Sequence, residues 1–156
     1  MNNLLNAKNE LIDTIVNDAA ILSWLQGIYG EAKSFTVIEG QPQVKNISGS
    51  EFPVFILELA DGDLDAPMIG GTTQDVIGDL FEFSIGWQFH ERGELLNQRL
   101  ELVRLLKDAL SGNKKLNNGT NDTVDYCRLK SYQNDKSIFY PEHFMNFIVY
   151  VETSIT

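Results

Sequence analysis

The segment Asp79-Leu80-Phe81-Glu82-Phe83-Ser84-Ile85-Gly86-Trp87-Gln88-Phe89-His90 carries the clearest pattern in the 156-residue chain. Large apolar side chains stand at every second position, and small or polar side chains stand between them. Because side chains alternate between the two faces of a β-strand, this spacing predicts one face in the core and the other toward water or a partner. Burial of the apolar row is worth on the order of 10 kcal/mol before conformational entropy is subtracted. We therefore expect this strand to anchor the fold.

Helical periodicity lies on both sides of the strand. Apolar residues recur at three- and four-residue steps over residues 3–27 and again over 94–111. Asp18 is a good N-cap, so the first helix either continues or is divided there, with the second part ending near Gly27 or Gly30. We expect the second helix to end just before Gly112, which would follow its C-cap. One apolar stripe of this helix should face the core, and it consists of Leu96, Leu100, Val103, Leu106 and Leu110.

Four further segments are rich in β-branched and aromatic residues and predict strands, namely 35–39, 52–59, 124–133 and 144–155. The last is apolar on both faces, so we expect a cover on both. The order is helix, three strands, helix, two strands. Because helices and strands do not strictly alternate, this order predicts one α+β domain over residues 1–156, with an antiparallel or mixed sheet of about five strands and two helices packed on one face.

Composition fits an ordinary globular domain, with 43% hydrophobic and 22% charged residues. The formal charge of −10 argues against nucleic-acid binding, which needs surplus Lys and Arg. No stretch has the apolar length of a membrane span, and no export signal is recognisable at the start. Cys127 is the single cysteine, which suits a reducing cytoplasm. We expect an intracellular protein that binds neither membrane nor nucleic acid.

The charge is unevenly distributed along the chain. Residues 1–91 contain three basic and fourteen acidic residues, whereas residues 92–156 contain nine basic and eight acidic ones. If the two portions occupy different sides of the molecule, one side is negative and the other nearly neutral. Such polarity either keeps the protein soluble or supports head-to-tail self-association.

The long segment from Ala60 to Gly78 is predicted to be a loop. Asp61, Asp63 and Asp65 have the spacing of a calcium loop, but Ala66 and Thr72 replace the turn glycine and the bidentate glutamate, which favours a solvated acidic loop. Glycines at 70 and 71 lack the lysine of a phosphate-binding loop and indicate flexibility. A loop of this length inside a compact domain is typically either functional or disordered, and we expect this one to be mobile in the isolated subunit and to order on assembly.

Residues that could support catalysis or metal binding are few. Cys127 could pair with His90 or His143 as a nucleophile, but its place in a predicted strand favours a buried structural thiol. Two histidines without a third ligand at suitable spacing do not make a zinc site. We therefore expect no enzymatic activity, cofactor or metal.

Two stretches resemble a known family. Residues 18–59 run from Asp18-Ala19-Ala20-Ile21-Leu22 to Phe52-Pro53-Val54-Phe55-Ile56-Leu57. Residues 79–152 run from the alternating strand through Gly93-Glu94-Leu95 and Cys127-Arg128-Leu129 to Phe147-Ile148-Val149-Tyr150-Val151-Glu152. In element order and local sequence this resembles the tail terminator, or tail-completion, proteins of long-tailed phages and prophages. The acidic segment 60–78 has no clear counterpart in that pattern.

The resemblance implies a structural virion subunit that forms a hexameric ring on the end of the tail tube. The ring would stop tube polymerisation and provide the head-joining surface, so its partners would be itself, the tube protein and a head-completion or connector protein. Assembly would take place in the host cytoplasm. Two alternatives are another head-to-tail connector or neck protein, and a dimeric small-molecule-binding regulatory module.

A ring repeats one head-to-tail interface by rotation, so each subunit presents two unlike surfaces. The residues that we expect at this interface come from the acidic loop and from the basic face of the second predicted helix. They are Asp61, Asp63, Asp65, Gly70, Gly71, Arg99, Arg104 and Lys107.

Overall fold

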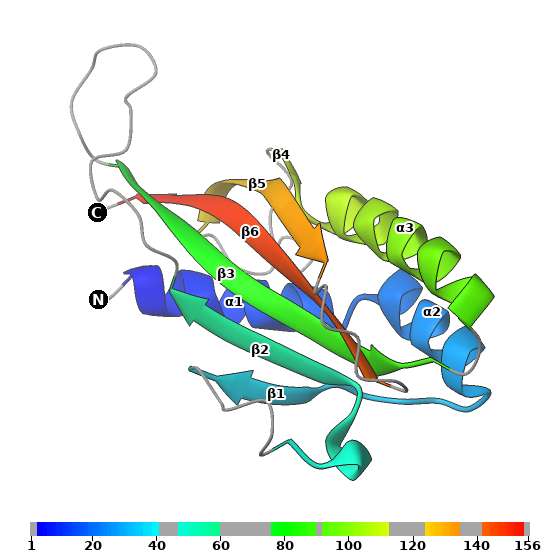
Figure 1. Ribbon diagram of the computed structural model, residues 1–156. Coiled ribbons are helices and arrows are strands. Elements are labelled where there is room, and N and C mark those ends of the chain that lie inside the picture. Colours follow the sequence, from blue (N-terminus) through cyan, green and yellow to red (C-terminus); the bar gives the residue numbers. More distant parts are fainter. Residues whose placement is uncertain are drawn as a thin grey trace.

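The structure is a computed structural model that describes residues 3–40, 47–59, 76–89, 92–112, 124–134 and 142–154. Within these ranges the chain has an α+β fold, with helices and strands in the predicted order (Figure 1). The helices are α1 (Asn3–Val16), α2 (Ala19–Tyr29) and α3 (Arg92–Ala109), with a 3-10 turn at Gly49–Glu51. The strands are β1 (Thr36–Glu39), β2 (Val54–Leu59), β3 (Val76–Gln88), β4 (Ser111–Gly112), β5 (Val124–Asn134) and β6 (Glu142–Ser154).

The strands form one mixed sheet in the order β1-β2-β3-β6-β5-β4. β1 and β2 are parallel, and every other described pair is antiparallel. The long strands β3 and β6 run side by side at the centre, with Phe83 opposite Phe147. The predicted fold class is confirmed. The two-residue β4 was not expected, and the prediction for Gly112 was wrong because it pairs with Cys127 in the sheet and does not follow a helix cap.

The first predicted helix is divided, as one of the two readings of Asp18 allowed. The Asp18 carboxylate accepts a hydrogen bond from the backbone N–H of Ile21 at 2.9 Å and so caps α2. At the other end, Gly30 has φ of +75°, a left-handed conformation that favours glycine, and its N–H donates to the carbonyl of Gln26. Local capping therefore sets both ends of α2.

All three described helices contribute to one core on one face of the sheet. The β3 side chains predicted to point inward are buried, and Phe83 stacks between Phe55 of β2 and Phe147 of β6 at centroid distances of 5.4 and 5.1 Å. Leu11 and Ile15 of α1 and Ile21 of α2 pack against this row. The predicted inward face is confirmed, but β3 begins at Val76, inside the segment predicted to be a loop, and ends at Gln88. The buried apolar row consists of Phe81, Phe83, Ile85 and Trp87 of β3 and Phe89 directly after it.

The opposite face of the sheet has a smaller apolar cluster near the 3-10 turn. Phe52 packs edge-on against Phe144 of β6, and Val54 of β2 is fully buried beside them. Further along β6, Ile148 and Tyr150 are only half-buried on this face. We expected both faces of the last strand to be buried. The helical face of β6 is buried, and the opposite face is packed near Phe144 but only half-buried at Ile148 and Tyr150.

The orientation of α3 differs from the prediction. Leu106 and Leu110 are buried as expected, but Leu96 and Leu100 are 61% and 56% exposed. The helix is rotated so that a different stripe faces the sheet, formed by Leu95, Leu102, Leu105, Leu106 and Ala109. Apolar residues cover more than half of the α3 circumference, so periodicity alone did not identify the inward side.

Gly86 allows β3 to lie close to Phe144. A Cβ at this position would lie 2.6 Å from Cε1 of Phe144 and 3.0 Å from Cγ2 of Val54. We expect Gly86→Ala to lower the free energy of unfolding by about 1–3 kcal/mol, as overpacking does in other cores. Phe144→Leu should reduce this cost because it removes the ring that the new methyl group meets.

Urea denaturation of the wild type, both single variants and the double variant measures this coupling. We expect the cost of Gly86→Ala to be smaller when residue 144 is leucine. Equal costs in the two backgrounds would contradict the packing described for this face.

Candidate functional site

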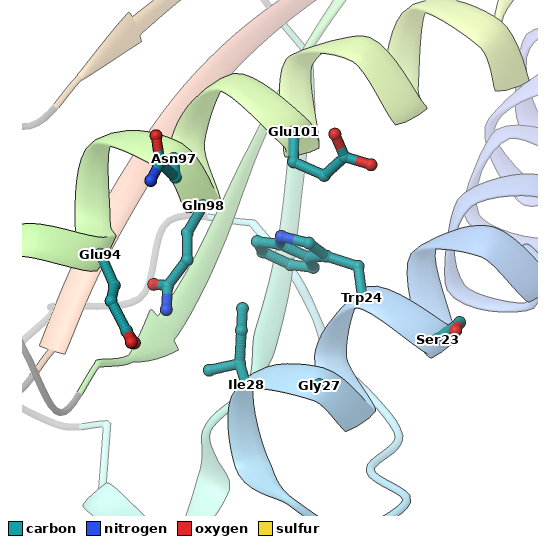
Figure 2. A pocket seen from close by; sticks show the side chains of 8 residues that line it. All are labelled: Ser23, Trp24, Gly27, Ile28, Glu94, Asn97, Gln98 and Glu101. Carbon is teal, nitrogen blue, oxygen red and sulfur yellow. The ribbon is translucent and has the colours of Figure 1, made fainter.

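A cleft lies between α2 and α3 on the helical side of the molecule (Figure 2). Its volume is about 480 Å³, and it is largely open to solvent. Helix α2 provides one wall, where the Trp24 ring and Ile28 project toward α3. Helix α3 provides the opposite wall, which consists of polar side chains only. The lining residues are Ser23, Trp24, Gly27, Ile28, Glu94, Asn97, Gln98 and Glu101.

The cleft combines an apolar wall with an acidic rim. Glu94 and Glu101 stand on the α3 side, and none of the described lining residues is basic. The indole Nε1 of Trp24 is buried and meets no hydrogen-bond acceptor within the described chain. The lining suits an occupant with an apolar part and a positive charge, because carboxylates attract cations and an indole offers apolar area.

Trp87 of β3 connects the cleft to the core. Its ring lies edge-on to Trp24 at 5.1 Å and to His143 at 5.0 Å between centroids. Its Nε1 donates a hydrogen bond to Oε1 of Gln98 at 2.9 Å, which ties α3 to the sheet. Trp87 thus contacts both α2, through Trp24, and α3, through Gln98, and these two contacts set the distance between the helices at the cleft.

A second attachment of α3 lies one residue further along the helix. The Nε of Arg99 donates to Nε2 of His143 at 2.9 Å, and His143 is 2% exposed. Nη2 of Arg99 also lies 3.2 Å from Nδ1 of the same ring. Burial lowers the pKa of Arg99. Arg99 therefore serves to hold α3 on β6 and is not a freely available surface cation.

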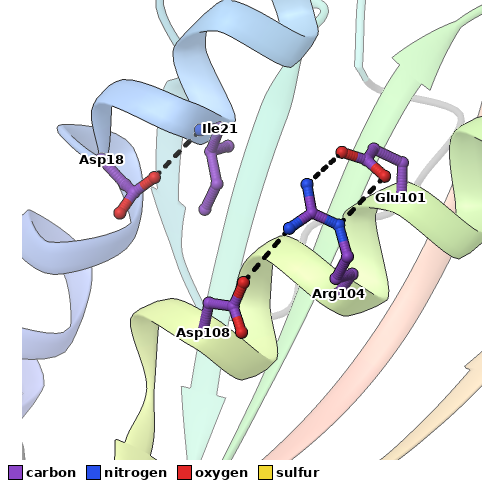
Figure 3. Close-up of polar contacts among 5 residues, drawn as sticks. All are labelled: Asp18, Ile21, Glu101, Arg104 and Asp108. Atoms are coloured by element: carbon purple, nitrogen blue, oxygen red, sulfur yellow. Dashed lines mark hydrogen bonds and ion pairs between the residues drawn. The ribbon is translucent and has the colours of Figure 1, made fainter.

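Arg104 is also engaged within its own helix (Figure 3). Its guanidinium binds both carboxylate oxygens of Glu101 and one of Asp108, the latter at 3.2 Å. The hydrogen bonds with Arg104 lower the pKa of Glu101, and those with Glu101 raise the pKa of Arg104. The three side chains are largely exposed, so their contribution to stability is small and sensitive to salt.

The residues predicted to lie at the interface differ in the contacts that they make within the chain. Arg99 binds His143 and Arg104 binds Glu101 and Asp108 within the chain, and their place at an assembly interface stays a prediction. Lys107 is exposed and forms no ion pair in the described part of the chain. The loop residues Asp61, Asp63, Asp65, Gly70 and Gly71 lie outside the described residues.

Cys127 and His143 do not form a catalytic pair. Cys127 lies opposite Val151 of β6, eight positions beyond His143, which at a strand rise of about 3.3 Å per residue separates them by about 25 Å. Cys127 is 1% exposed, and burial raises the pKa of its thiol to about 12. The interpretation as a structural thiol fits this position. His90, the other suggested partner, lies outside the described residues.

Sequence reasoning did not identify the cleft. Trp24, Gln98 and Glu101 lie on two helices that are far apart in the sequence, and no motif connects them. The available signal was Trp24 in the expected first helix together with polar residues at 94, 97, 98 and 101, one side of the second helix. That spacing could not predict a cleft, because the sequence did not show which side of the second helix faces the core.

No family model matches the chain, and no curated protein matches it in sequence. No helix in the described ranges is long and apolar enough to cross a membrane. Within the same ranges, no group of three or more His, Cys, Asp or Glu side chains is placed to hold a metal ion. Inference about function therefore depends on the surfaces of the subunit.

The thiol of Cys127 should be inert in the folded protein. A pKa of about 12 in place of 9.0 makes the thiolate fraction near pH 8 about 1000-fold smaller, and burial further blocks access. We expect an aromatic disulfide reagent to react with the native chain at least about 1000-fold more slowly than with the chain in urea. Rapid reaction of the native protein would show that β5 opens or that the thiol is exposed.

Proposed function

We propose that the chain is a structural subunit of a homo-oligomeric ring, and that this ring is the tail terminator of a long-tailed phage or prophage. In this role about six copies sit on the end of the tail tube, stop its polymerisation and provide the surface to which the head is joined. The resemblance of residues 18–59 and 79–152 to tail-completion proteins supports the specific role.

The observation that carries the proposal of a ring is the division of charge across the sheet. Residues 1–91, with three basic and fourteen acidic side chains, contribute β1, β2 and β3, which make one half of the sheet. Residues 92–156, with nine basic and eight acidic side chains, contribute β6, β5 and β4, the other half. This division applies to the strands, because α1 packs against β6 and α2 packs against α3. Head-to-tail contacts bring unlike halves together, and such contacts close into rings when the rotation allows.

The partners proposed for the ring are the tail tube protein and a head-completion or connector protein. The ring works in the virion tail after assembly in the host cytoplasm, and its role requires no catalysis or cofactor. The net charge of −10 is compatible with passage of DNA, because a surface poor in surplus cations does not hold the phosphate backbone. A connector or neck protein is the alternative within the same structural class.

The cleft between α2 and α3 favours a second candidate function, the small-molecule-binding regulatory module. Its volume of about 480 Å³ and its Trp24 wall are compatible with a small ligand. Such modules work as dimers, so their mass in solution corresponds to two subunits and not to six. The division of charge has no role in that case.

Disruption of the gene in the phage or prophage that encodes it tests the proposed role. Without a terminator the tube keeps polymerising, so electron micrographs of lysates should show tails of variable and excessive length and few infectious particles. Supply of the wild-type chain from a plasmid should restore a uniform length. Tails of normal length in the disrupted strain would exclude a terminator, and tails of normal length without attached heads would favour a connector.

A further inference from the structure

Leucines 96 and 100 form an exposed apolar pair on α3. They are 61% and 56% exposed and lie one turn apart on the helix. Tyr132 of β5, 50% exposed, is paired with Phe147 and therefore projects from the same face of the sheet that carries α3. Lys107 continues the same side of α3 and is exposed without an ion pair within the described chain. We call the three α3 residues Leu96, Leu100 and Lys107 the α3 flank.

The α3 flank and the cleft lie on different sides of one helix. At about 100° per residue, Leu96, Leu100 and Lys107 fall within an arc of about 40°. Glu94 and Glu101, which border the cleft, fall within an arc of about 20° that is centred about 130° away around α3. A single subunit therefore presents the two surfaces in divergent directions.

The two surfaces are complementary in chemistry. The cleft offers the apolar ring of Trp24 and Ile28, with the carboxylate of Glu94 at its rim and no basic residue in its described lining. Glu101, the other carboxylate at the rim, is paired with Arg104 of the same helix. The α3 flank offers two leucines and the ammonium group of Lys107. Apolar area would meet apolar area, and Lys107 would be attracted to Glu94.

We propose that the α2–α3 cleft of one subunit receives the α3 flank of the next copy of the chain. This inference deepens the proposed ring and depends on it, because it specifies which surfaces meet. A two-fold dimer would have to form the cleft–flank contact twice about one axis, which the divergence of about 130° between the two surfaces on α3 opposes. Repetition of the contact therefore gives a ring or an open filament.

The attachments of α3 keep this geometry fixed. Gln98 borders the cleft and also accepts the hydrogen bond from Trp87, while Arg99, next in sequence, binds His143. These contacts hold the rotation of α3, and with it the outward position of Leu96 and Leu100. The interface is thus formed before the subunits meet, which lowers the entropic cost of association.

Two variants separate the two surfaces. Leu96→Ser with Leu100→Ser removes the apolar part of the α3 flank at exposed positions. Gly27→Arg blocks the cleft, since an added Cβ at Gly27 meets no atom within 4 Å and an arginine there places charge and bulk at its base. Gly27→Ala is the matched control, and melting temperatures close to wild type show that the fold is retained.

Sedimentation equilibrium up to millimolar concentration provides the measurement. Each variant alone should associate at least about 100-fold more weakly than wild type, whereas Gly27→Ala should not. An equimolar mixture of the two variants should form a heterodimer and nothing larger, because one intact flank meets one intact cleft and no further contact remains.

The other outcomes overturn the inference. A monomeric wild type at millimolar concentration, variants that assemble like wild type, or a mixture that forms no heterodimer each excludes this interface. Loss of assembly in both variants together with normal tails in the gene disruption would retain the interface and exclude the terminator role. Intact assembly of the variants together with overlong tails in the gene disruption would retain the role and exclude the interface.

Discussion

The Trp87 indole joins the sheet to both helices of the cleft, and the functional surfaces depend on that contact. Its ring meets Trp24 of α2 edge-on, and its Nε1 donates to Gln98 of α3. An indole N–H that is buried without an acceptor is costly, so this hydrogen bond resists rotation of α3. Through one side chain the alternating pattern of β3 thus sets which residues of α3 face the core and which remain outside.

This dependence explains why the sequence predicted the sheet better than the site. The alternation from Phe81 to Phe89 predicts β3 because a period of two has one structural meaning, and the division at Asp18 follows from capping chemistry. In α3, by contrast, Leu95 and Leu96 begin two competing stripes of the same period. The hydrogen bond from Trp87 to Gln98 favours one of the two stripes. This is a tertiary contact, so it cannot be predicted from the local sequence of the helix.

The cationic residues show the same difference between composition and structure. Arg99, Arg104 and Lys107 form one basic group in the sequence, but in the structure His143 binds Arg99 and two carboxylates bind Arg104, whereas Lys107 forms no ion pair in the described part of the chain. The strands of residues 1–91 and 92–156 do form separate halves of the sheet, whereas α1 packs against β6 and α2 packs against α3. The strands therefore keep the division that the sequence shows, and the helices do not.

The central claim is that copies of the chain meet head to tail, with α3 at the boundary between them. Electron cryomicroscopy of the purified wild-type protein, at a concentration where it associates, tests this claim most directly. We predict closed rings in which the α2–α3 cleft of each subunit encloses Leu96 and Leu100 of its neighbour. Two-fold symmetric dimers, or rings in which this cleft and these leucines face solvent, would contradict it.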